Sequence, residues 1–591
     1  MQLALGMGQD QLPDVPDGWA FTLVDNEADF RSLIRFIRLA TDVVVDTETT
    51  GLYAWRGHRI AGVSIGIEHS CWYVPFRHGG ATNMPISHLD ELLRNLHGRQ
   101  LTFHNAKFDI KMMAADGMVV PHPGLIRDTM LAAYVMNENE PSFKLENLAA
   151  RYVDPAAHDG EQWLNRLLID HSLDKGQMWK LDAEQVMFYA CCDVMLTSQL
   201  AGFYKPHLKE WGLYDIWLEV CRYAMVFAKA EMRGVLVDLD MCRSRMESAA
   251  VAMADLEGRL HELAGYKANV RSSKPMQALV GVPSTAKDIL REIAPINVAA
   301  DLLLKHRSFD KAVGSYYKPY IEKSDECGVL RPDNWIHGTV TTRISCKNPN
   351  LMAIPRRGEA DEGQVRGVKD VFIARPGYYL VQADYSQAEI RLGAHYTGDE
   401  NMIRILSSED ADIHTETAEE LSISRQDGKT LNFSVIYGIG AATLSERLGI
   451  SEERARAYLD KYHKKRPGFR LLYKDCERTA TDRGYIRLWT GRVRRYNVPE
   501  AEPHKAMSNL IQGGVAEIIR HAMLRLASLI EGEDTHMLLQ VHDSVVFEVP
   551  IQDMDRMVPS IESAMTDFNF SVPMKVDIHY GKTLGKLTEW T

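Results

Sequence analysis

Two short apolar stretches, far apart in the chain, each end at an aspartate. The first, VQADYSQAEIR (381–391), begins as a strand that is expected to carry Asp384 at its end. The second, LLQVHDSVVFEV (538–549), has two apolar runs around a polar turn, which predicts a hairpin with Asp543 at the turn. If both strands lie in one sheet, the two carboxylates meet. Such a pair is typical of sites that transfer phosphoryl groups with two divalent cations.

A helix is expected to begin directly after Asp384. Ser386 and Glu389 have the S-x-x-E spacing of a capping box, which predicts a helix start at Ser386. Taken alone, an aspartate before a helix is more often a turn or cap residue than a metal ligand. The second aspartate, Asp543, favours the metal site.

The stretch RQDGKTLNFSVIYG (425–438) predicts a helix with one mixed face. Arg425, Lys429, Phe433 and Tyr437 recur every four residues, so the face is cationic at its beginning and aromatic at its end. This polarity suits a nucleoside triphosphate, with the phosphates on the cations and the base and sugar against the rings. The alternative is an amphipathic helix whose aromatic residues lie in the core.

The first 205 residues predict an α/β domain with acidic residues after its strands. The fragments are DTET (46–49), HNAKFD (104–109) and FYACCD (188–193). Each has a structural alternative: a strand-to-turn junction, helix caps and a surface contact at i, i+4 spacing, respectively. Together, the candidates are Asp46, Glu48, Asn105, Asp109, Tyr189 and Asp193.

These motifs resemble those of a known family. DYSQAEIR and QVHDS are similar to motifs A and C of the family A (DNA polymerase I-like) DNA polymerases, and the helix between them resembles that family's fingers helix. The three N-terminal fragments resemble the motifs of DEDD-type 3′–5′ exonucleases with a tyrosine in the third. The resemblance covers nearly the whole chain and indicates a bacterial or phage-like member. Because only about 20 residues precede the first strand, the family's 5′ nuclease domain is expected to be absent.

The resemblance implies a fold. An α/β, RNase H-like exonuclease domain is expected over residues 1–205, followed by an α+β polymerase domain shaped like a right hand over residues 206–591. Within the latter we expect the thumb at about 240–335, the palm at about 336–398 and 500–591, and the fingers at about 399–499.

The resemblance also implies roles for individual residues. Each active site would hold two Mg²⁺ ions, for which Mn²⁺ can substitute, on Asp46, Glu48, Asp109, Asp193, Asp384 and Asp543. The residues implied in catalysis are Asp384, Asp543, Tyr189 and Lys429. The implied nucleotide contacts are Arg425, Lys429, Phe433, Tyr437, Tyr385, His414 and Glu389, the last also blocking the ribose 2′-hydroxyl. The implied DNA contacts are Arg343, Asn350, Gln512, His542, Asn105, Lys305, Arg307 and Lys311.

Several positions depart from the family pattern. In HGTVTTRISCKNPNLMAIP (337–355), Arg343, Asn350 and Pro355 match. The departures are Thr342, Cys346, Met352, Ala353, Ser434, His504, Ser508 and Ser544. Lys305, Arg307 and Lys311 of the expected thumb could equally well be solvent-exposed residues of an amphipathic helix. Both motif aspartates are retained, which indicates a divergent lineage with intact activity.

Composition bounds the cellular setting. The net charge of −12 argues against a uniformly basic nucleic-acid binder but allows a local basic channel. Eight cysteines without a CxxC pair predict a reducing compartment. No signal peptide and no segment of membrane-spanning length are expected, which predicts a cytoplasmic protein. The expected partners are primer–template DNA, dNTPs and a single-stranded 3′ end; a processivity factor, helicase or single-strand-binding protein is not identifiable.

Two other functions fit parts of the sequence. A dedicated 3′–5′ exonuclease of the RNase D type would need motifs A and C to be idle. A non-catalytic replication scaffold would need broken carboxylate sets, whereas every motif carboxylate is present.

Overall fold

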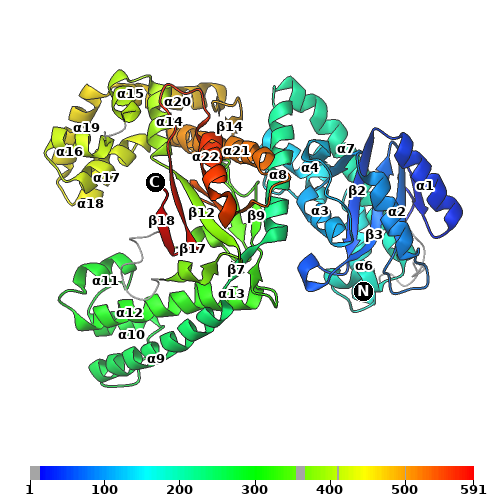
Figure 1. Cartoon of the computed structure of the whole chain (residues 1–591), viewed down its shortest axis with the longest axis horizontal. Coiled ribbons are helices and arrows are strands. Elements are labelled where there is room, and N and C mark those ends of the chain that lie inside the picture. Colours follow the sequence, from blue (N-terminus) through cyan, green and yellow to red (C-terminus); the bar gives the residue numbers. More distant parts are fainter. Residues whose placement is uncertain (1–12, 355–366, 409–411, 499–500) are drawn as a thin grey trace, which may run out of the picture.

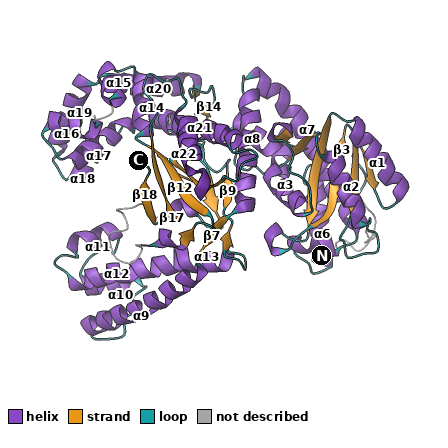
Figure 2. Ribbon diagram, in the orientation of Figure 1, coloured by secondary structure: helices purple, strands orange, loops and turns teal. Residues whose placement is uncertain are grey.

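The computed structural model describes residues 13–354, 367–408, 412–498 and 501–591. Pro355 and the first twelve residues, to which part of the signal-peptide expectation applies, lie outside these ranges. The chain forms an N-terminal α/β domain followed by an α+β region, as the sequence predicts (Figures 1 and 2).

The N-terminal domain is built on a mixed, six-stranded sheet in the order β1-β4-β3-β2-β5-β6. The central strand β2 pairs antiparallel to β3 and parallel to β5, and its apolar residues 43–45 are buried. The strands are β1 (Ala20–Leu23), β2 (Asp42–Thr49), β3 (Ile60–Ile67), β4 (Ser70–Pro75), β5 (Gln100–Phe103) and β6 (Ile126–Asp128). The helical segments are α1 (Glu27–Leu39), α2 (Ile86–Leu96), α3 (Ala106–Ala115), α4 (Thr129–Met136), α5 (Leu145–Tyr152), α6 (Asp159–Asp170), the 3₁₀ helix η3 (Lys175–Lys180) and α7 (Ala183–Glu210).

Helix α7 crosses the boundary that the sequence places at residue 205. It continues through Pro206 to Glu210, and α8 (Tyr214–Arg233) begins after a short connection. By length and composition alone α7 could span a membrane, so the expectation that no segment reaches that length is wrong. Most of its apolar stretch is buried, because it packs along β1–β4 as a core helix of the N-terminal domain.

The α+β region is built on an eight-stranded sheet in the order β15-β16-β12-β17-β11-β7-β8, with β18 beside β17; we refer to it as the palm because most of its strands come from the residues expected to form that part. Two of its strands, β7 and β8, come from outside the residues that the sequence assigns to the palm. The strands are β7 (Val235–Val237), β8 (Val329–Leu330), β11 (Phe372–Ile373), β12 (Tyr378–Tyr385), β15 (His536–Val541), β16 (Ser544–Pro550), β17 (Val576–Thr583) and β18 (Lys586–Glu589). The helices α14 (Ala388–Thr397), α21 (Ala506–Leu529) and α22 (Met554–Thr566) complete the region.

Two helical regions extend from the palm, and Figure 1 shows them on opposite sides of its sheet. The thumb is formed by α9 (Leu239–Ala264), α10 (Ser273–Val280), α11 (Lys287–Ile293), α12 (Val298–Ala312) and α13 (Lys318–Lys323). The fingers contain α15 (Glu400–Ser407), α16 (Ile413–Leu421), α17 (Arg425–Ile436), α18 (Ala441–Leu448), α19 (Glu452–Lys465) and α20 (Gly468–Arg483). Two small hairpins are formed by β9 (Asp333–Trp335) with β10 (Ser345–Lys347), and by β13 (Tyr485–Arg487) with β14 (Val493–Arg495).

Buried ion pairs join the N-terminal domain to the α+β region. Lys107 of α3 lies 2.6 Å from the Glu231 carboxylate of α8. Glu138, which follows α4, accepts hydrogen bonds from Arg494 and Arg495 of β14, each at 3.0 Å. All five side chains are buried, so each charge depends on its partner across the interface.

Candidate functional site

The palm strands place the two motif aspartates at neighbouring positions of the backbone. In the antiparallel pairing of β12 with β16, Asp384 lies opposite Ser544, the residue after Asp543. The backbone N–H of Tyr385 donates to the Asp543 carbonyl at 3.2 Å, which fixes the hairpin turn beside the end of β12. On its other side Asp384 lies opposite Asp577 of β17, and both residues are exposed.

The predicted capping box after Asp384 is wrong. Helix α14 begins at Ala388, after Gln387 in the left-handed conformation (φ 55°), and no side chain caps it. The Glu389 carboxylate instead accepts hydrogen bonds from the Arg343 guanidinium at 2.7 Å and from the Tyr437 hydroxyl at 2.6 Å. Glu389 is buried, and these long-range partners satisfy its charge better than a local backbone N–H would.

Two residues expected to contact the nucleotide are buried instead. The Tyr385 hydroxyl donates to the Met565 carbonyl at 2.6 Å, so this side chain belongs to the core. The His414 ring is 2% exposed and lies 3.1 Å from the Asn432 amide. Only the backbone of Tyr385 therefore borders the aspartates, and His414 supports α17 from within.

The fingers helix α17 presents the expected face. Arg425 and Lys429 are exposed, whereas Phe433 and Tyr437 are half-buried with ring centroids 6.4 Å apart. The helix ends before Gly438, whose φ of +66° favours glycine. A Cβ there would also lie 2.6 Å from the Tyr473 ring. Both the backbone conformation and this close approach therefore require glycine at the end of the helix.

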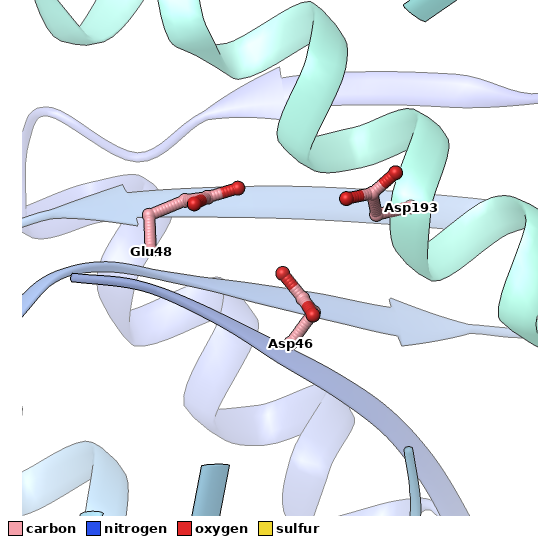
Figure 3. A group of neighbouring side chains, drawn as sticks. All are labelled: Asp46, Glu48 and Asp193. Atoms are coloured by element: carbon pink, nitrogen blue, oxygen red, sulfur yellow. The ribbon is translucent and has the colours of Figure 1, made fainter. Parts of the chain in front are cut away.

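A second acidic cluster lies in the N-terminal domain, about β2 and α7. Because β2 continues to Thr49, Asp46 and Glu48 share a face, and Asp193 of α7 points toward them (Figure 3). Ligand atoms of these three residues lie within 4.8 Å of one another. The group has the spacing and oxygen donors of a cation site.

Burial makes the ionised form of this cluster costly. It raises the pKa of Asp46 to about 6, an effect that Lys175 opposes and Glu146 reinforces. Burial, with the charges of Asp46 and Asp193, raises the pKa of Glu48 well above its usual range. Burial and the charge of Asp46 do the same to Asp193. A bound cation would relieve this mutual repulsion.

Asp109 lies beside the cluster but is engaged elsewhere. Its carboxylate accepts hydrogen bonds from the Thr47 backbone N–H at 3.0 Å and from the Thr47 hydroxyl at 2.7 Å. These bonds tie α3 to β2 between the two acidic residues of that strand. Burial raises the pKa of Asp109 well above its usual range, and the charge of Asp46 adds to the rise.

The residues expected to contact DNA have varied surroundings. The Lys305 ammonium pairs with Asp301 at 2.7 Å, and the Arg307 guanidinium donates to Thr285, which fastens α12 to the loop between α10 and α11. Asn350 caps a short 3₁₀ helix through the Met352 N–H at 3.0 Å. The remaining candidates are exposed Lys311, half-buried Gln512 of α21, exposed His542 at the hairpin turn and half-buried Asn105 before α3.

Three charged residues near these sites escaped sequence reasoning. Asp577 was missed because its strand pairing with β12 is long-range. Glu146 of α5 and Lys175 of η3 act electrostatically on the N-terminal carboxylates, yet each lies in a stretch without a motif. The lone lysine in LDKGQMW (173–179) carries no signal that distinguishes it from a surface residue.

Comparisons with known proteins assign both parts of the chain to families. Residues 239–586 match the family described as DNA polymerase family A, and residues 21–209 match the family described as 3′–5′ exonuclease. The chain is 28% identical to DNA polymerase I of Synechocystis sp. over 95% of its own length and 62% of the relative's. It is 30% identical to DNA polymerase I of Bacillus subtilis over 77% of its length and 54% of the relative's. The chain thus spans less than two thirds of these relatives.

A solved structure shares the fold. It is the POL domain of Pol1 from M. smegmatis, in complex with a DNA primer–template and dNTP, with a TM-score of 0.80 and 23% identity. The match covers 95% of this chain and 99% of that one. The expected fold, an α/β domain followed by an α+β region shaped like a right hand, is therefore confirmed. The chain belongs to DNA polymerase family A.

Proposed function

We propose that this protein is a template-directed DNA polymerase with 3′–5′ proofreading, acting in DNA replication or repair. The observation that carries the proposal is the presence of two separate acidic sites. One comprises Asp384 at the end of β12 and Asp543 in the adjoining β15–β16 turn, and the other is the cluster of Asp46, Glu48 and Asp193. Its substrates would be primer–template DNA and dNTPs, with a single-stranded 3′ end in the N-terminal site.

In the palm, Asp384 and Asp543 would hold divalent cations between the primer end and the incoming triphosphate. Such cations, most simply two Mg²⁺, activate the attacking oxygen and neutralise charge on the phosphates. Arg425 and Lys429 would hold the triphosphate, and Phe433 would pack against the sugar. Arg425 reaches Asp412 at 2.6 Å across an exposed surface, a pair that a triphosphate could replace at small cost.

The N-terminal cluster fits the same kind of cation. Glu48 Oε1 is buried and has no hydrogen-bond partner among the described residues, which leaves a lone-pair acceptor directed into an acidic site. Asp46, Glu48 and Asp193 would hold the cation, and Asp109 would complete the set after moving from Thr47. Tyr189, one helical turn before Asp193, would orient the attacking water.

A single assay separates the candidate functions. A 5′-labelled primer on a longer template, with MgCl₂, should lengthen when dNTPs are present and shorten when they are omitted. A dedicated exonuclease would only shorten the primer, and a scaffold would bind it without changing its length. Absence of lengthening in active wild-type protein would overturn the polymerase proposal.

Cation binding is expected to stabilise the fold more strongly at high pH. The folded protein keeps protons on the N-terminal carboxylates that the unfolded chain releases, since burial raises the pKa of Asp46 to about 6. Without metal, stability should therefore fall as pH rises from about 4 through 6. Adding MgCl₂ at about 100 times its Kd should restore about 2.7 kcal/mol at pH 8 and much less at pH 5.

Thermal unfolding with MgCl₂ or EDTA at the two pH values measures this difference. Asp46→Asn should reduce the pH-dependent gain, whereas Asp384→Asn, which alters only the palm site, should keep it. Equal stabilisation at both pH values would contradict a proton-competing cation site on the N-terminal cluster.

Glu389→Ala should weaken discrimination against ribonucleotides, by about tenfold or more. Glu389 is held rigidly by Arg343 and Tyr437, so its side chain would occupy a fixed volume beside the nascent sugar. The ratio of rNTP to dNTP incorporation in single-turnover extension measures the effect. Glu389→Gln keeps the side-chain volume and serves as the matched control. If the alanine variant discriminated as well as the wild type, Glu389 would be a purely structural anchor.

A further inference from the structure

We propose that Lys175 binds the phosphate of the nucleotide being removed in the N-terminal site. Its ammonium would donate to a non-bridging oxygen of the scissile phosphodiester. The inference rests on the proposed 3′–5′ exonuclease function and adds to it a cation that no motif supplies.

Lys175 lies at the rim of the acidic cluster. It is the first residue of η3, and its ammonium lies 5.2 Å from the centroid of the Tyr189 ring, in cation–π contact. Tyr189 is buried and is one helical turn from Asp193. The Tyr189 ring therefore positions the ammonium close to the acidic cluster, while the Lys175 side chain is 49% exposed.

The ammonium held against Tyr189 also interacts electrostatically with the cluster. Its charge lowers the pKa of Asp46, Glu48 and Asp193. In return, although burial lowers the pKa of Lys175, Asp193 and neighbouring carboxylates raise it, and the net shift is upward. The Lys175 ammonium is thus charged at neutral pH, and its contact with the Tyr189 ring keeps it on the side of the N-terminal cluster.

An anionic substrate gives this lysine a partner. A phosphodiester approaching Asp46, Glu48 and Asp193 meets repulsion unless cations intervene. Once bound cations neutralise those carboxylates, the attraction that holds Lys175 weakens, and a phosphate oxygen becomes the strongest available acceptor. Two other carboxylates, Glu146 and Glu161, also attract Lys175. The Glu161 carboxylate is 3.6 Å from the ammonium, longer than a charge-assisted hydrogen bond, so this pair leaves the ammonium able to donate to a phosphate.

The released mononucleotide offers a direct test, since it keeps the scissile phosphate as its 5′-phosphate. Calorimetric titration of the whole protein with dTMP in MgCl₂ should show about 10- to 100-fold weaker binding for Lys175→Gln, the range of a charged hydrogen bond. Thymidine, which lacks the phosphate, should bind both proteins equally. Degradation of single-stranded DNA should lose a similar factor in kcat/KM, and primer extension should be unchanged. Lys175→Arg should recover most of the lost affinity.

Lys180→Gln is the matched control, because it removes the same charge from an exposed lysine of the same short helix. It should behave as the wild type. Unchanged dTMP affinity in Lys175→Gln, or equal weakening for dTMP and thymidine, would overturn the phosphate contact. If wild-type protein did not degrade DNA at all, the proposed exonuclease function would fail instead, so the two failures are distinguishable.

Discussion

Asp384→Ala is expected to reduce dNTP incorporation by at least about a thousandfold while leaving 3′–5′ degradation intact. The alanine removes a carboxylate that would offset cation charge at the palm site, and no neighbouring side chain on β12 replaces it. Extension of a labelled primer in single-turnover conditions measures the loss. Degradation of the same primer without dNTPs, by the same preparation, shows that the protein is folded.

Asp577→Asn is the matched control for this change. Asp577 is an exposed carboxylate directly opposite Asp384 on β17, so it tests whether negative charge at this end of the sheet is sufficient. We expect a loss of less than about tenfold, as for a charge that only adds to the local field. Near-normal extension by Asp384→Ala, or an equal loss in Asp577→Asn, would refute the assignment of Asp384.

Asp46→Ala should have the converse effect. Degradation of a primer end should fall by at least about a thousandfold, and extension should keep its wild-type rate. Asp46 is central to the N-terminal cluster, because its charge raises the pKa of Glu48, Asp109 and Asp193. Removing it takes away a cation ligand while relieving repulsion among the other three. The variant should therefore be more stable than the wild type in EDTA.

Asp42→Asn controls for the loss of an acidic residue from β2. Asp42 lies four residues before Asp46 on the same strand, about 13 Å away, and accepts a hydrogen bond from Thr102 at 2.8 Å. It should leave degradation unchanged. Residual degradation near the wild-type rate in Asp46→Ala would mean that hydrolysis occurs at another site.

Sequence reasoning succeeded where the signal is local. The apolar run before Asp46 predicts the strand β2, and the polar turn at Asp543 predicts the hairpin of β15 and β16. Four-residue spacing likewise placed exposed Arg425 and half-buried Phe433 on one side of the helix. In these cases the repeat of the sequence pattern follows directly from the number of residues per turn or per pleat of the element.

Sequence reasoning failed where the contacts of a side chain depend on a residue far away in the sequence. Glu389 has good local capping spacing, but Arg343, 46 residues earlier, and Tyr437, 48 residues later, bind its carboxylate instead. The burial of Tyr385 and His414 likewise depends on α22 and α17, which pack against them only in the folded chain. Propensity and spacing do not contain this information, because tertiary hydrogen bonds outweigh a single cap.

The ion pairs between the domains bear on how a proofreading-free form could be engineered. Cutting the chain before α8 would leave Glu231 without Lys107, and Arg494 and Arg495 without Glu138. Each of these side chains is buried in the interface, and breaking such a pair on one side is expected to cost about 3–5 kcal/mol. A truncated polymerase would start with a defect comparable to the whole stability of many domains. Substitution within the N-terminal cluster would remove the proposed nuclease activity while keeping the domain and its interface contacts.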